Sequence, residues 1–402
     1  MKGSVRRGDR LGRRPGHRGV ITPLLLVAIV VAGCTGGPVL ANPPAVRPSP
    51  PATPAPSARP TDPIPVVFPR DDAPHDRLTE WWYYTGHLRD TASGDRYGFE
   101  YVIFRAERGD FPVTWASHLA ITDESHGRFL YAQRAEIGPG VDLRPSGGGF
   151  DLAMLPDPER PAGGTNPPWR MTGIGGADRL IATTTTAESA AAGSASPIGL
   201  DLRLTARKPP ALHDRDGWID FGAGGGSYYY SRTRMSAHGT VTLDGRILPV
   251  DGEAWFDHQW GDFIAVGGGG WDWFAVNLAD GSDLTLSFVR DRTGAYSLVY
   301  GTYVGADGSA THLPADAFAV TVTGHWTSPK TGAVYPAGWH VTVPGQGLTI
   351  ELAPTVAGQE LDTRPTTGVV YWEGSQVVRA TRNGTPVAGE AYVELTGYAR
   401  AP

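Results

Sequence analysis

Two short stretches of the chain combine carboxylates and an imidazole with many tryptophans. They are EAWFDHQWGDF at residues 253–263 and WDWFAVNL at residues 271–278, and together they hold four tryptophans and no lysine or arginine. A carboxyl group packed among rings has a raised pKa, because burial disfavours its charged form, and it can then donate a proton near neutral pH. The surrounding aromatic faces attract positive charge. Asp257, His258 and Asp272 are therefore candidate catalytic residues for protonating an alkene and sheltering the carbocation that forms.

A structural interpretation of the same residues stays open. Asp257, His258 and Asp272 can equally be buried polar groups that satisfy turns and neighbouring backbone atoms, with the tryptophans as ordinary core. A third possibility is a surface module that uses its aromatic residues to bind a partner.

Strand alternation would divide the candidate residues between two faces. In EWWYYTGHL, residues 80–88, one face takes Glu80, Trp82 and Tyr84 and the other takes Trp81. By the same rule His258 shares a face with Phe256 and Trp260, whereas Asp257 shares one with Trp255. Asp272 aligns with the apolar residues that follow it. The candidates for lining a ligand site are Glu80, Trp81, Trp82, Tyr84, His118, Trp255, Trp260, Trp271 and Trp273.

Several other chemistries lack their motifs. The sequence has no G-x-S-x-G elbow, no H-E-x-x-H pair and no dinucleotide fingerprint before a helix. Its 11 histidines are scattered, so we predict no metal site.

The elements that would carry these residues are short strands. The chain is rich in Gly, Pro, Trp and Tyr, and Asp-Gly or Asn-Gly pairs at 244, 280, 307 and 383 are flanked by strand-like runs, as in type I′ hairpins. No long apolar segment of helical period follows residue 66, and residues 188–197 read as a loop. We expect an all-β fold of two domains, residues 66–226 and 227–402, with the boundary at the glycine-rich stretch near Gly226.

The N-terminal residues have the pattern of an export signal. Seven basic residues precede an apolar run at residues 20–31, which is too short to span a bilayer, and the run ends in VAGC at Cys34. This is similar to a bacterial lipobox, so residues 1–33 are a predicted signal peptide and Cys34 a predicted lipidation site. An uncleaved anchor or an ordinary signal is the alternative. Residues 34–65 are proline-rich and predict a disordered tether, which would hold the folded part outside the cytoplasm on a membrane lipid anchor.

Charge excludes one class of partner. Removing residues 1–33 takes away seven basic and one acidic residue, which changes the formal charge from −6 to −12. So acidic a chain is a poor ligand for nucleic acid.

Five ordered segments resemble one family. TEWWYYTGHL, SHLAITD, WFDHQWGDF, GGWDWFAVNLADGSDL and residues 371–398 resemble the signature segments of the lipocalin-like carotenoid 1,2-hydratase and AttH-like family, whose members are often labelled secreted hydrolases. The resemblance covers residues 75–400. It implies two tandem lipocalin-like (calycin) β-barrels, an apolar ligand in a barrel or at the domain junction, and no cofactor. The family's hydratases also carry a Tyr-x-Asp pair on a following strand, where this chain has Thr285 and Ser287.

Two main functions follow from the resemblance. The first is an extracytoplasmic lipoprotein that binds a lipid, isoprenoid or polyketide and passes it to an ABC-type transporter. The alternative is a cofactor-independent hydratase or hydrolase that uses acid catalysis on a C=C bond. The direction in which Asp257, His258 and Asp272 point relative to a cavity would discriminate between them.

Overall fold

The structure is a computed structural model that describes residues 61–145, 147–155, 169–191, 196–263 and 268–399. The signal peptide, Cys34 and most of the proline-rich segment lie outside the described residues. Regular structure within these ranges is nearly all β-strand, as predicted. No helix among the described residues has the length and apolarity needed to cross a membrane. The helical elements are α1 (Thr186–Ala191), η1 (Arg70–Asp72), η2 (Pro139–Val141), η3 (Gly222–Gly224) and η4 (Pro344–Gln346).

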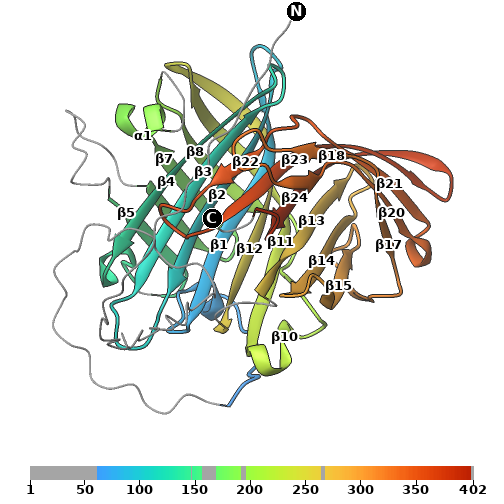
Figure 1. The fold of residues 1–402 in the computed structure, drawn as a ribbon, viewed down its shortest axis with the longest axis horizontal. Coiled ribbons are helices and arrows are strands. Elements are labelled where there is room, and N and C mark those ends of the chain that lie inside the picture. Colours follow the sequence, from blue (N-terminus) through green and yellow to red (C-terminus); the bar gives the residue numbers. More distant parts are fainter. Residues whose placement is uncertain (1–60, 146, 156–168, 192–195, 264–267, 400–402) are drawn as a thin grey trace, which may run out of the picture. The chain divides into compact units, whose positions relative to one another are not determined.

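The first sheet is a nearly closed, lipocalin-like barrel of antiparallel strands. Its order is β4-β3-β2-β1-β12-β11-β8-β7-β6-β5, with β9 and β10 added to β11, and the edge strands β4 and β5 approach each other (Figure 1). Its strands are β1 (Thr79–Asp90), β2 (Arg96–Ala106), β3 (Thr114–Asp123), β4 (Arg128–Ile137), β5 (Phe150–Met154), β6 (Trp169–Ile174), β7 (Ala177–Thr183), β8 (Gly199–Ala206), β9 (Ala211–Leu212), β10 (Trp218–Asp220), β11 (Gly226–Leu243) and β12 (Arg246–Asp262).

The second sheet is a half-barrel, also antiparallel. Its order is β16-β15-β14-β13-β24-β23-β21-β20-β17, β22 pairs with β23, and β18 and β19 form a separate pair. These strands are β13 (Gly268–Leu278), β14 (Asp283–Asp291), β15 (Tyr296–Val304), β16 (Ala310–Pro314), β17 (Ala319–Val322), β18 (His325–Thr327), β19 (Val334–Pro336), β20 (Trp339–Val343), β21 (Leu348–Pro354), β22 (Glu360–Asp362), β23 (Val370–Arg382) and β24 (Thr385–Thr396).

The chain changes sheet between Asp262 and Gly268, later than the boundary predicted near Gly226. β11 and β12 pair with each other and with β8 and β1, so both belong to the first sheet. The glycine-rich stretch forms η3 and then returns to the same sheet. A glycine-rich composition favours a break between strands, but it does not distinguish a break within one sheet from a link between two sheets.

Two of the four predicted hairpin turns have the left-handed pair of a type I′ turn. The φ angles are 52° and 72° at Asp244 and Gly245, and 49° and 80° at Asn383 and Gly384. In the other two turns the glycine alone, Gly281 or Gly308, has a positive φ.

The segment predicted as a loop at residues 188–197 begins inside helix α1. Thr185 and Glu188 form a reciprocal capping box, in which the backbone N–H of each donates to the side chain of the other at 2.6 and 3.0 Å. The T-x-x-E spacing was a readable signal for this helix.

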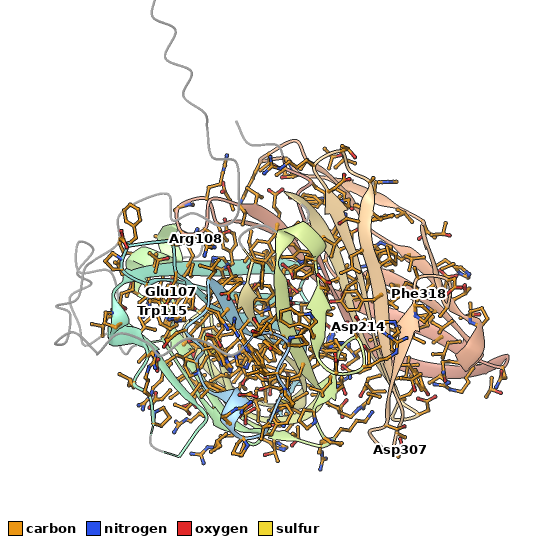
Figure 2. All side chains as sticks on the ribbon, turned by 90° about the horizontal axis from the view of Figure 1, so that it is seen from below. Glu107, Arg108, Trp115, Asp214, Asp307 and Phe318 are labelled. Carbon is orange, nitrogen blue, oxygen red and sulfur yellow. The ribbon has the colours of Figure 1, made fainter. Side chains whose placement is uncertain are left out.

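The central strands are buried on both faces. On β1, Trp82 and Tyr84 pack in the core of the first barrel, whereas Tyr83 packs between the sheets with Trp255 and Trp273. Figure 2 shows the side chains of both sheets, with Trp115 from the core of the first and Phe318 from the core of the second. Alternation therefore sorts the side chains of one strand between a barrel core and the space between the sheets.

A buried aspartate joins the two sheets. Asp283, on β14, accepts hydrogen bonds from Lys208 at 2.6 Å, from Arg234 and Thr233 at 2.8 Å, and from Asn277 at 2.7 Å. Lys208, Thr233 and Arg234 belong to the part of the chain that forms the first sheet, so these charge-assisted bonds hold the sheets together.

Candidate functional site

A cavity of about 770 Å³ lies between the two sheets, on the faces opposite to their cores. Rings form much of its wall, among them Trp81, Tyr83, Phe104, Trp271 and Trp273. Exposed residues of the β14–β15 hairpin, 292–294, also line it and mark its open side. This inter-sheet cavity has the size of a small-molecule site and lies at the junction of the two sheets.

Asp257 reaches the inter-sheet cavity from β12. Its carboxyl accepts hydrogen bonds from the Tyr229 hydroxyl at 2.6 Å, from the Trp255 indole N–H at 2.6 Å and from the Ser231 hydroxyl. Burial raises its pKa to about 7, although the three donors act in the opposite direction. Asp257 can therefore hold or release a proton near neutral pH.

Glu100, on β2, is a stronger candidate acid. Its Oε1 accepts a hydrogen bond from the Tyr371 hydroxyl at 2.7 Å, and its buried Oε2 has no hydrogen-bond partner in the described part of the chain. Burial raises the pKa of Glu100 to about 8, and the nearby Glu394 carboxyl adds to that shift. A protonated carboxyl in the wall of an apolar cavity, with one oxygen that makes no hydrogen bond, is a candidate proton donor.

Two more glutamates complete a group of carboxyls. Glu394, on β24, lines the cavity, and burial raises its pKa to about 7. Glu373, on β23, is fully buried, accepts a hydrogen bond from Tyr83 at 2.8 Å and has its pKa held well above its usual range. We call Glu100, Asp257, Glu373 and Glu394 the carboxyl cluster.

Burial is the largest cause of the raised pKa values of the glutamates in the carboxyl cluster, and neighbouring carboxyls, rather than cations, add to it. The charged groups that shift the pKa values of Glu100, Glu373 and Glu394 are other members of the cluster, and all of them raise those values. Carboxylates this close cannot all ionise together, so they titrate as a coupled set. Protons therefore remain in the cavity wall at neutral pH.

Two members of the carboxyl cluster accept a hydrogen bond from a hydroxyl group that also contacts a buried, neutral histidine. His118 binds the Tyr371 hydroxyl at 2.8 Å, and Tyr371 donates to Glu100. His213 binds the Ser231 hydroxyl at 2.7 Å, and Ser231 donates to Asp257. Burial lowers the pKa of both histidines to about 3, so they stay uncharged and act only by fixing the hydroxyls.

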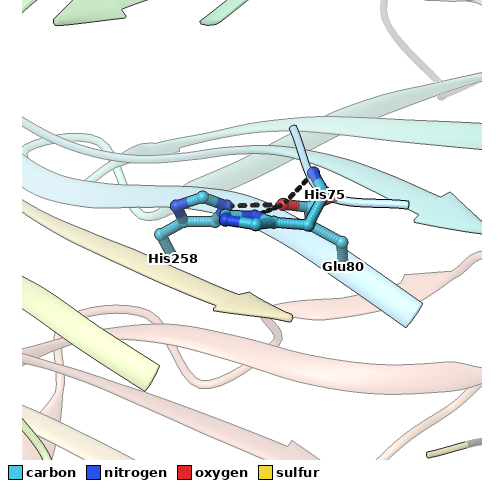
Figure 3. A group of neighbouring side chains, drawn as sticks. All are labelled: His75, Glu80 and His258. Carbon is cyan, nitrogen blue, oxygen red and sulfur yellow. Dashed lines mark hydrogen bonds and ion pairs between the residues drawn. The ribbon is translucent and has the colours of Figure 1, made fainter. Parts of the chain in front are cut away.

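His258 lies on the opposite face of β12, inside the first barrel. Its Nε2 contacts Glu80 Oε1 at 2.9 Å, and His75 Nδ1 contacts the same oxygen at 2.8 Å (Figure 3). His258 stacks on Trp82, and His75 lies flat on Trp260. The two imidazoles lower the pKa of Glu80 to about 2, despite complete burial. This is an ionised, hydrogen-bonded core group, and we call it the barrel triad.

The barrel triad also has the composition of a metal site. One candidate ligand atom from each of His75, Glu80 and His258 lies within 4.8 Å of the others. However, the contacts to Glu80 are 2.8 and 2.9 Å, whereas tetrahedral zinc ligands at about 2.0 Å from the metal stand roughly 3.3 Å apart. The distances between the three side chains therefore fit hydrogen bonds better than coordination of a zinc ion.

Asp272 is also turned away from the cavity. It forms an ion pair with Arg290 and accepts hydrogen bonds from the Tyr398 hydroxyl at 3.0 Å. Burial raises its pKa, while Arg290 opposes that shift. Arg290 and Tyr398 themselves line the cavity, so Asp272 acts there only through these two residues.

The structure thus divides the predicted site residues. Among them, those that line the inter-sheet cavity are Trp81, His118, Asp257, Trp271 and Trp273, with Trp255 bonded to Asp257 behind the wall. Glu80, Trp82, Tyr84, His258 and Trp260 lie inside the first barrel instead, because alternation gives them the other face of β1 and β12. The grouping of His258 and Asp272 with Asp257 in one catalytic set is therefore wrong in its geometry.

The three glutamates of the carboxyl cluster are not among the residues predicted from the sequence. Glu373 and Glu394 lie within the C-terminal stretch that carries the family resemblance, and Glu100 lies in a strand-like run. A lone acid inside an otherwise apolar strand was the available signal. Ser287, one of the two residues that the resemblance aligns with the Tyr-x-Asp pair, lines the cavity as well.

Comparison with known proteins gives one family. The AttH-like family model matches residues 59–398. The structure is similar to that of an AttH protein from Nitrosomonas europaea, with 29% identity, a TM-score of 0.70, and coverage of 85% of this chain and 100% of that one. It also shares the fold of kievitone hydratase from Nectria haematococca, with 16% identity, a TM-score of 0.62, and coverage of 90% and 98%. A search of curated proteins gives no match.

Proposed function

The chain belongs to the AttH-like family, and we propose that it binds an apolar, unsaturated molecule in the inter-sheet cavity and adds water across a C=C bond, or removes it, without a cofactor. The observation that carries this proposal is Glu100, whose buried Oε2 is uncommitted beside a ring-lined cavity. The name of kievitone hydratase, which shares the fold, supports the same reaction class.

The reaction needs an acid and a base in one cavity. Protonated Glu100 gives its proton to one alkene carbon, and the other carbon becomes cationic. The faces of the cavity tryptophans stabilise that charge. A water molecule attacks the cation, and an ionised cluster member, Asp257 or Glu394, takes the proton that the water loses. The sum is the addition of H and OH, and the reverse sequence is dehydration.

Deuterium labelling tests the proposal and does not require an identified substrate. The purified protein is incubated in D₂O with an apolar extract of its source cells, and mass spectrometry detects small molecules that gain deuterium on carbon. We expect Glu100→Gln to lower the labelling rate at least about 100-fold, the range for loss of a general acid. The matched control Glu351→Gln, at an exposed carboxyl on β21, should leave it unchanged.

Binding without chemistry is the second candidate, and the size and ring lining of the cavity favour it. A small molecule that co-purifies with the protein but never gains deuterium would favour this function, with delivery to an ABC-type transporter as its extension. Equal labelling rates in the wild type and in Glu100→Gln would contradict the assigned acid.

We also propose that Cys34 is lipidated and anchors the protein outside the cytoplasm. The lipobox-like VAGC supports this location. Metabolic labelling with a radioactive fatty acid should mark the wild type and leave Cys34→Ala unlabelled. Equal labelling of both would refute the anchor.

A further inference from the structure

We infer that the inter-sheet cavity is a binding site for an organic cation, a quaternary or tertiary ammonium group on an apolar body, held between the carboxyl cluster and the cavity rings. This inference deepens the proposed function, because such an ammonium ion resembles the carbocation of the proposed reaction.

The carboxyl cluster has no paired cation among the described residues of the wall. Three members of the carboxyl cluster line the cavity, and the fourth, Glu373, lies behind them. The two arginines in the wall that are not exposed are already paired: Arg105 with Glu107 and Asp76, and Arg290 with Asp272. These pairing acids lie outside the cluster, so the two arginines do not neutralise it.

Glu100 also has an oxygen atom that makes no hydrogen bond within the described ranges. Glu100 is 1% exposed, and its Oε2 has no hydrogen-bond partner among the described residues, although it is an oxygen that water or a donor would normally satisfy. A cation beside it would offset the burial of that carboxylate, as an opposite charge does for any buried carboxylate.

The cavity wall combines aromatic rings with carboxyl groups. Trp81, Trp271 and Trp273 line the same cavity as Glu100 and Glu394. Aromatic faces together with carboxylates are the usual recognition site for alkylammonium groups. A calcium ion instead needs six to eight oxygen ligands at about 2.3–2.6 Å, whereas Glu100 and Asp257 each commit oxygen atoms to hydroxyl donors.

The barrel triad shows the effect that a cation has in this protein. Glu80 is as buried as Glu100, yet it is ionised because imidazoles contact it. The carboxyl cluster lacks such a partner among the described residues, and a bound ammonium would supply it.

The test uses a matched pair of probes, phenyltrimethylammonium and its neutral carbon isostere tert-butylbenzene. Their affinities are measured at pH 8 by quenching of tryptophan fluorescence and by calorimetry. We expect the cation to bind at least tenfold more tightly than the isostere. Its affinity should fall as pH is lowered to 5.5, because protonation of Glu100, Asp257, Glu373 and Glu394 competes with the cation. Neutral His118 contributes nothing to this dependence, and the arginines in the wall keep their charge throughout.

Variants locate the binding. Glu100→Gln and, independently, Glu394→Gln should each weaken binding of the cation several-fold with little effect on the isostere. Glu351→Gln should change neither affinity. Calorimetry in buffers of different ionisation enthalpy should show protons released when the permanently charged probe binds.

Several outcomes would overturn the inference. They are tighter binding of tert-butylbenzene, equal affinities of the two probes, and displacement of the cation by millimolar Ca²⁺ but not by other alkylammonium ions. Deuterium labelling without cation binding would sink this inference and leave the proposed function standing. Cation binding without deuterium labelling would support this inference and contradict the proposed hydration reaction.

Discussion

Glu80 and Glu100 are equally buried glutamates with opposite ionisation. Glu80 contacts two imidazoles inside the first barrel, and its pKa is lowered to about 2. Glu100 contacts one phenol at the inter-sheet cavity, and its pKa is raised to about 8. Burial disfavours the charge in both places, so the neighbours decide the outcome. A buried carboxyl contributes to stability where a cation meets it, and becomes available for proton chemistry where none does.

The largest effect should follow from removing the ionised member of this comparison. Glu80→Gln leaves His75 and His258 without their shared carboxylate, so the free energy of unfolding at pH 7 should fall by about 3 kcal/mol. Urea unfolding measures it. A loss below about 1 kcal/mol would mean that the triad does not hold the barrel core as described.

The two glutamates should give opposite pH dependences. The contribution of Glu80 is present above its unfolded pKa near 4.5 and is lost as pH falls toward about 2. Glu100 has a raised folded pKa, so its effect is favourable below about 4.5 and stability is lost as pH rises toward about 8. Relative to the wild type, Glu100→Gln should therefore gain on the order of 2 kcal/mol at pH 8.5 and little at pH 5.5. Urea unfolding at the two pH values checks this, and a gain that does not depend on pH would contradict it.

Asp257 should show intermediate behaviour, because three donors hold it although its pKa is raised to about 7. Asp257→Asn replaces one acceptor by a donor, so we expect a loss of about 1–2 kcal/mol, or a few degrees in Tm. Thermal melting measures it. An unchanged Tm would assign Asp257 a purely chemical role.

The smallest effect on the free energy of unfolding should come from a solvent-exposed carboxylate–histidine pair. Glu351 contacts His340 on the exposed face of the second sheet, with 54% of its side chain exposed. Glu351→Gln should change the free energy of unfolding by less than about 0.5 kcal/mol. A loss comparable to that of Glu80→Gln would show that burial does not separate the two pairs.

The sequence predicted the fold class and the hairpins well, because alternation, turn dipeptides and aromatic content are local signals. Alternation also placed Asp257 and His258 on opposite faces of one strand, as the structure has them. The carboxyl cluster could not be predicted in the same way. Glu100 and Glu394 come from strands of different sheets, and only the packing of one sheet on the other brings them together. The predicted boundary near Gly226 differs from the point where the chain changes sheet for a related reason. Strand pairing is non-local and cannot be predicted from local composition.

Because of where the inter-sheet cavity lies, different residues form the hydrophobic cores and the cavity wall. Each sheet keeps its own hydrophobic core, and the cavity wall is built from the opposite faces. If one sheet shifted over the other by a single residue, about 3.3 Å, the shape of the cavity would change while the packing within both cores stayed the same. Substitutions on the two docking faces would thus reshape the cavity without any change in either hydrophobic core.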